Sequence, residues 1–217
     1  MFTSEGRTIA TFSVGGLISG LLTILLSELS AWVIWAGAGA LFALALFTSL
    51  LIANRNDWLT TRAFGRNYLI AAGILILIYP LAFIVSLEVT FAYDWLYESL
   101  LRARLSRRGS PDEGFIIGLA FAAVVSALAL AIAMRILTGN WNRKVTILMI
   151  VGGVTTIPLA WIASKIFSKL DDFWPHWLLI FGQVLFAFLS GYWLITTDED
   201  VSNRNERSTL NVRRAEQ

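Results

Sequence analysis

Six apolar stretches, each about as long as a bilayer core is thick, alternate with short polar segments along the chain. Since an α-helix rises 1.5 Å per residue, roughly 20 apolar residues cross a hydrocarbon core of about 30 Å. In lipid the backbone must satisfy its own hydrogen bonds, which favours helices. The pattern predicts an all-α polytopic membrane protein, a bundle of about six transmembrane helices forming a single transmembrane domain over residues 1–196. The expected spans are about 8–28, 30–53, 67–89, 111–138, 145–168 and 174–196.

The fourth span has the clearest end signals. Ser110 is a suitable N-cap, Pro111 suits the first helical position, and Glu113 completes a capping box three residues after the serine. Gly139 is expected to end the same helix, because glycine readily adopts the left-handed conformation that follows a helix C-terminus.

Tryptophan positions support these boundaries. Tryptophan prefers the headgroup level of a bilayer, where its ring is partly in lipid and its N–H can meet a polar partner. Eight of the nine tryptophans lie near expected span ends, and only Trp35 lies a turn deeper. The eight are Trp32, Trp58, Trp95, Trp141, Trp161, Trp174, Trp177 and Trp193.

Two segments lie outside the spans. Residues 90–105 carry apolar side chains near one helical face, which predicts either an interfacial amphipathic helix or a continuation of the third span. An interfacial helix would provide a membrane-surface shelf or a platform for a partner. Residues 197–217 are polar and mixed in charge, which predicts a disordered tail unless a partner holds it.

The composition agrees with a membrane protein and gives its orientation. Charged residues make up 15% of the chain, against about 25% in soluble domains. With a cytoplasmic N-terminus, the cytoplasmic side carries 11 of the 17 Lys and Arg residues. The positive-inside rule therefore places both termini in the cytoplasm, and we expect a cell (inner) membrane location. The net charge of +2 gives no sign of a nucleic-acid partner.

An internal repeat is suggested by two short matches. Residues 80–86 (PLAFIVS) and 158–164 (PLAWIAS) agree at five of seven positions, and ALAL recurs at 43–46 and 127–130. The order predicts that the second and third spans duplicate the fourth and fifth with the same orientation. The alternative is coincidence within a small apolar alphabet.

Small residues spaced by four predict where helices pack closely, because lipid supplies no hydrophobic force between helices. Such ridges occur in the first, fourth and fifth spans, and they suit contacts within the chain or a homodimer seam. The expected packing residues are Gly16, Gly20, Gly118, Ala122, Ser126, Gly152, Thr156 and Ala160.

Residues that carry enzyme chemistry are scarce. The chain has no cysteine and one histidine, His176, and its spans hold almost no ionisable group near the bilayer centre. Asp172 and His176 have helical i,i+4 spacing and Asp171 is adjacent, but Pro175 interrupts the segment and no third ligand is evident. We therefore expect no catalytic residue, metal site or cofactor.

Proline-broken helices supply the candidate solute path. Pro80 and Pro158 each remove a helical hydrogen bond, so kinks are expected in the third and fifth helices. Polar groups near these positions and in the sixth span form a possible midplane site. They are Tyr79, Thr155, Thr156 and Gln183.

Together these features predict a non-enzymatic membrane protein that works by association, as an accessory or scaffolding subunit of a larger membrane assembly. Its expected partners are the lipid bilayer and other membrane proteins or a second copy of itself. The alternative is a channel or uncoupled carrier for a small neutral or weakly polar solute. A membrane enzyme using Asp171, Asp172 and His176 ranks third.

Overall fold

The computed structural model describes residues 4–27, 37–52, 62–102, 112–166 and 174–215. Apart from the turn at residues 139–142 they are helical, and they contain no strand. The helices are α1 (Ser4–Ser27), α2 (Ala38–Ile52), α4 (Arg62–Arg102), α5 (Asp112–Thr138), α6 (Arg143–Ile166) and α7 (Trp174–Ala215). Five of them are long and apolar enough to cross a membrane, and α2 is described over 15 apolar residues. The all-α prediction is confirmed, and the chain is an integral membrane protein.

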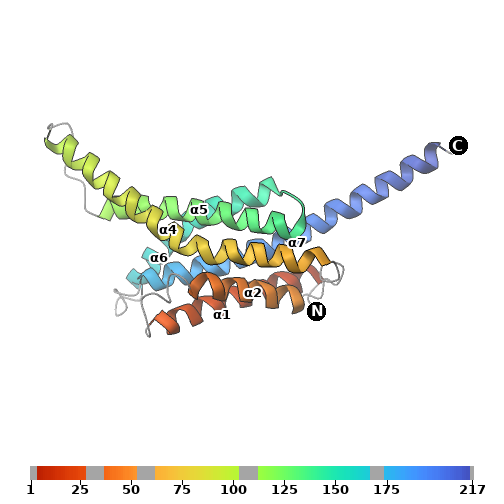
Figure 1. Ribbon diagram of the computed structural model, residues 1–217, viewed down its shortest axis with the longest axis horizontal. Coiled ribbons are helices and arrows are strands. Elements are labelled where there is room, and N and C mark those ends of the chain that lie inside the picture. The colour runs from red at the N-terminus through yellow and green to blue at the C-terminus, as the bar shows by residue number, and fades with distance from the viewer. Residues whose placement is uncertain (1–3, 28–36, 53–61, 103–111, 167–173, 216–217) are drawn as a thin grey trace.

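The helices are arranged as a closed ring, in which each packs on its neighbours in the order α1, α2, α4, α5, α6, α7 and back to α1. Successive helices run in opposite directions, so α1 begins and α7 leaves at the same end of the bundle (Figure 1). We call this the terminal end, marked by Arg66 and Arg135, and the other the far end, marked by Glu88 and Gly114.

The spacing between these ends matches a bilayer. About 22 residues separate Arg66 from Glu88 on α4, and about 21 separate Gly114 from Arg135 on α5, which correspond to roughly 33 and 32 Å. Arg66, Glu88 and Arg135 are all exposed. Polar contacts between α4 and α5 lie near both levels, where Asn67 Nδ2 donates to Ile136 O (3.1 Å) and Thr90 Oγ1 to Gly114 O (3.3 Å).

Local chemistry explains the turn between α5 and α6. Gly139 has a φ of 73°, and its N–H donates to Arg135 O at 2.7 Å, so the prediction that Gly139 ends the helix is confirmed. Asn142 then caps α6, because its Oδ1 accepts the Val145 N–H at 3.1 Å. Ser110 and Pro111, the expected start of α5, lie outside the described residues.

Two helices are longer than the spans expected for them. α4 continues without a break to Arg102, so residues 90–102 extend the third span. α7 continues to Ala215, and so includes most of the polar tail. The chain has no glycine or proline after Gly191, so it lacks the residues that most strongly end helices.

Two prolines lie inside membrane-spanning helices. α4 changes direction along its length (Figure 1), and Pro80 lies inside this helix. Pro158 lies inside α6. Because proline lacks an N–H and its ring crowds the preceding turn, a bend in α4 has a local cause.

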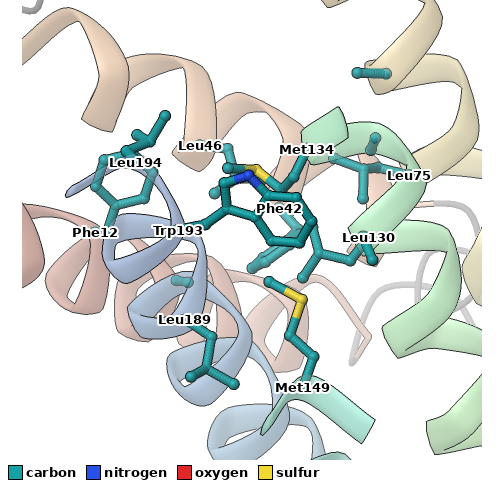
Figure 2. Close-up of a cluster of buried hydrophobic side chains, with 14 of the residues drawn as sticks. Phe12, Phe42, Leu46, Leu75, Leu130, Met134, Met149, Leu189, Trp193 and Leu194 are labelled. Carbon is teal, nitrogen blue, oxygen red and sulfur yellow. The ribbon is translucent and has the colours of Figure 1, made fainter. Parts of the chain in front are cut away.

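The bundle centre toward the terminal end is filled by a large apolar cluster (Figure 2). Trp193 of α7 lies in the middle of it and is 0% exposed. Its ring is enclosed and does not face lipid, and the cluster holds apolar side chains from all six helices. They include Phe12, Phe42, Leu46, Leu75, Leu130, Met134 and Met149.

The two segments of the suggested repeat expose and bury corresponding positions. In residues 80–86 and 158–164, Ala82 and Ala160 are buried while Leu81 and Leu159 are exposed. In residues 43–46 and 127–130, the first alanine and last leucine of each are buried and the intervening leucine is exposed. The matched residues therefore occupy equivalent faces of their helices, as duplicated hairpins would require.

Candidate functional site

A buried polar cluster joins three helices in the far half of the bundle. Gln183 of α7 is 1% exposed, and its Nε2 donates to Thr23 Oγ1 of α1 at 3.5 Å. Gln183 also shares a side-chain hydrogen bond with Tyr79 of α4. Ser19, one turn before Thr23, is 1% exposed. We call Ser19, Thr23, Tyr79 and Gln183 the polar cluster.

The hydrogen bonds of the polar cluster determine the orientation of the Gln183 amide. Thr23 Oγ1 donates its only hydrogen to Ser19 O at 2.9 Å, so toward Gln183 it can only accept. The amide must therefore direct its NH₂ group at Thr23. This orientation leaves Gln183 Oε1 buried without a partner, and Ser19 Oγ is likewise buried and unpaired.

Two glycines allow α7 to approach this part of α1. A Cβ at Gly16 would lie 2.6 Å from Gln183 O, and one at Gly20 would lie 3.2 Å from Ile180 Cα. Both distances are too short for a larger residue without movement of the backbone. The glycines thus bring the Gln183 side chain close enough to reach α1, since Gln183 Oε1 lies 3.8 Å from the Cβ position of Gly20.

The structure brings together two of the four candidate solute-path residues, Tyr79 and Gln183. Thr155 is exposed, and its hydroxyl donates to Gly152 O at 2.8 Å. Thr156 is buried, and its hydroxyl donates to Gly153 O at 2.6 Å. Both threonines therefore use their hydroxyls on their own helix.

Ser19 and Thr23 are not among the predicted solute-path residues. Their four-residue spacing signals a helical face, but it cannot tell close packing from polar contact. The distinction depends on Gln183, which lies 160 positions after Thr23 in the chain.

The other expected packing residues lie at several helix contacts. A Cβ at Gly118 would meet Ser86 O and Thr90 Oγ1 of α4, and one at Gly152 would lie 2.7 Å from Leu185 Cδ2 of α7. Ala160 is fully buried. Ala122 and Ser126 are half-buried.

A second polar network ties α7 to the α5–α6 turn at the terminal end. Trp193 Nε1 donates to Thr138 Oγ1 at 3.3 Å, and Asn142 Nδ2 donates to Thr196 Oγ1 at 2.8 Å. Next to these bonds, the Trp141 ring packs edge-on against the Trp193 ring, with 6.4 Å between the ring centres. The Arg135 guanidinium lies 5.5 Å from the Trp141 ring centre. This network holds α7 at the point where the helix leaves the bundle.

Ionisable groups do not gather into a metal-binding set among the described side chains, which contain no group of three or more His, Cys, Asp or Glu residues. Asp171 and Asp172 lie outside the described residues, and so does the side chain of His176. The polar cluster consists of hydroxyl and amide groups, which can hydrogen bond a neutral molecule or join helices.

Comparison of the chain with protein-family models, with curated proteins and with solved structures gives no match.

Proposed function

We propose that the protein is an accessory or scaffolding subunit that binds another component of a membrane assembly through the end of α7. The observation that carries this proposal is the length of α7, which has 42 residues. Its apolar part is Trp177–Thr197, of 21 residues. The following residues, through Ala215, add about 27 Å of helix beyond the membrane.

This extension projects away from the other helices of the chain (Figure 1). A single helix of about 18 residues in water is only marginally stable, because helices in proteins depend mainly on packing. A partner surface that packs along residues 198–215 would supply the missing stabilisation. The segment is polar and carries both signs of charge, which suits a polar protein surface and not lipid.

The bundle centre favours association over transport. A solute path requires polar groups along its whole length, whereas the terminal half of the centre is filled by Trp193, Phe42, Met134 and other apolar side chains. Close packing of this kind suits a rigid membrane anchor that positions an extramembrane helix.

A helix-breaking substitution tests the role of α7. In Asn205→Pro the helix is interrupted within the extension, while the matched control Asn205→Ala keeps it. Each variant is extracted from native membranes in a mild detergent, and particle mass and composition are measured. We expect the wild type and Asn205→Ala in a complex of defined stoichiometry, and Asn205→Pro alone. Wild-type protein that is recovered only as a monomer would contradict the proposal.

A second candidate function, passage of a small neutral solute, is favoured by the two unpaired oxygens Ser19 Oγ and Gln183 Oε1. Buried polar atoms are usually hydrogen bonded, so this pair suits a small hydrogen-bonding guest. Liposomes containing the purified protein are tested for swelling in glycerol or urea. Swelling that is lost in Gln183→Leu and kept in Gly182→Ala favours this function, and permeability equal to that of empty liposomes excludes it.

A further inference from the structure

The far half of α4 carries a large exposed apolar surface. Phe91 is 65% exposed, Trp95 is 72% exposed and Leu96 is 51% exposed. The apolar part of α4, Gly65–Glu98, has 34 residues, or about 51 Å of helix, whereas a bilayer core is about 30 Å thick. These three residues therefore lie beyond the level of Glu88 and Gly114, where the membrane core ends.

This surface continues the lipid-facing stripe of the same helix. Leu77, Leu81 and Ile84 are all exposed and are spaced four and three residues apart, as one helical face requires. The same spacing continues through Glu88 to Phe91 and Trp95. Apart from the Glu88 carboxylate at the membrane boundary, one apolar face thus runs from the lipid core past the end of the bundle.

The opposite face of this segment packs on α5. Tyr93 and Tyr97 stack at 6.2 Å, and a Cβ at Gly114 would lie 2.9 Å from the Tyr93 ring. Asp94 and Glu98 are also exposed. Glu98 follows Trp95 on the same stripe, whereas Asp94 lies between this stripe and α5, where its Oδ1 would be 2.7 Å from a Cβ at Gly114. The segment is therefore amphipathic around its exposed side, with acidic groups next to aromatic ones.

We propose that Phe91, Trp95 and Leu96 bind the headgroup layer of the bilayer, so that the far part of α4 rests on the membrane surface. Figure 1 shows this half of α4 inclined away from the direction of the bundle. A helix that leans outward over lipid turns its lipid-facing stripe toward the headgroups. Aromatic rings prefer this layer. Because aromatic and aliphatic groups make this contact, it needs no lipid charge, and a zwitterionic surface is a sufficient partner.

The absence of cysteine makes a direct test possible, since single cysteines can be labelled without background. Phe91→Cys and Trp95→Cys are compared with the control Asp94→Cys, all at exposed positions, after reconstitution of the purified protein into phosphatidylcholine vesicles. A nitroxide on each reports collision with oxygen, which concentrates in lipid, and with a nickel chelate, which stays in water. We expect the oxygen-to-nickel ratio at 91 and 95 to exceed that at 94 by roughly twofold or more.

Two results would overturn the proposal. Equal ratios at 95 and 94 in vesicles would place the aromatic face in water. Strong nickel access at 95 in vesicles, with protection only in native membranes, would assign the face to a protein partner.

A further measurement leaves the native side chain in place. Brominated phosphatidylcholine should quench the tryptophan fluorescence of the wild type more than that of Trp95→Phe, and equal quenching would count against lipid contact. These outcomes are independent of whether the α7 extension binds a partner.

Discussion

Two helices of this protein extend past the membrane, at opposite ends and with opposite chemistry. The α4 extension is aromatic on its exposed side and is braced by α5, through Thr90 and Gly114. The α7 extension is polar and projects alone (Figure 1). The difference shows that helix length alone does not define a role, because the environment that stabilises each extension depends on its side chains. We assign the first to the bilayer surface and the second to a protein partner.

A proline substitution in each extension should give the largest difference in stability. Leu96→Pro should destabilise the bundle by about 3 kcal/mol, because proline breaks a helix that packs on α5. Asn205→Pro should change the stability of the isolated protein by less than about 0.5 kcal/mol, because the α7 extension projects away from the other described helices (Figure 1). Thermal unfolding in detergent measures both. Equal losses would mean that the tail packs on the bundle.

The contact between Gly118 of α5 and the α4 backbone has no room for a methyl group. In Gly118→Ala the new Cβ would overlap Ser86 O and crowd Thr90 Oγ1, so we expect a loss of about 2–3 kcal/mol. The matched control is Gly73→Ala, since nothing lies within 4 Å of a Cβ there. That control should be neutral or stabilising by up to about 1 kcal/mol. If both variants unfold at the same temperature, α5 does not brace α4 at this level.

The attachment of α7 to the bundle depends on Gly16. In Gly16→Ala the Cβ would lie 2.6 Å from Gln183 O and 2.7 Å from Ala187 Cβ, which should cost about 2 kcal/mol. Gly182→Ala changes α7 itself at a position with open space and should be tolerated. Detergent thermal stability is the measurement, and an unchanged midpoint for Gly16→Ala would show that α1 and α7 meet elsewhere.

The smallest expected effect concerns the point where α7 leaves the bundle. Asn142→Asp keeps the N-cap of α6 but removes the donor to Thr196 Oγ1, and should cost about 1 kcal/mol. Asn142→Ala removes both interactions and should cost about 2 kcal/mol. A comparison of their unfolding temperatures separates the two contributions. Equal losses would mean that the cap alone stabilises this turn.

Much of the fold follows from short-range information in the sequence. The lengths of the apolar runs predicted helices of membrane-spanning size, and Gly139 predicted the end of α5, because backbone hydrogen bonding and the conformational freedom of glycine are local properties. The structure describes the tail to Ala215 as helix, since low hydrophobicity argues against burial and does not by itself prevent a helix. Trp193 lies near a span end as predicted, but the sequence could not tell that its ring is enclosed, because a tryptophan there can face either lipid or protein.

The candidate site shows where local reasoning stops. Tyr79 and Gln183 were recognisable as polar residues within apolar spans, but so were Thr155 and Thr156, and the sequence ranked all four alike. The sequence by itself determined that the chain is helical, enters the membrane and carries almost no charge within it. Only the tertiary structure decided that α1, α4 and α7 join Ser19, Thr23, Tyr79 and Gln183, and that Trp193 is enclosed. The physical reason is that these contacts connect residues far apart in the chain, whose meeting depends on how the helices pack.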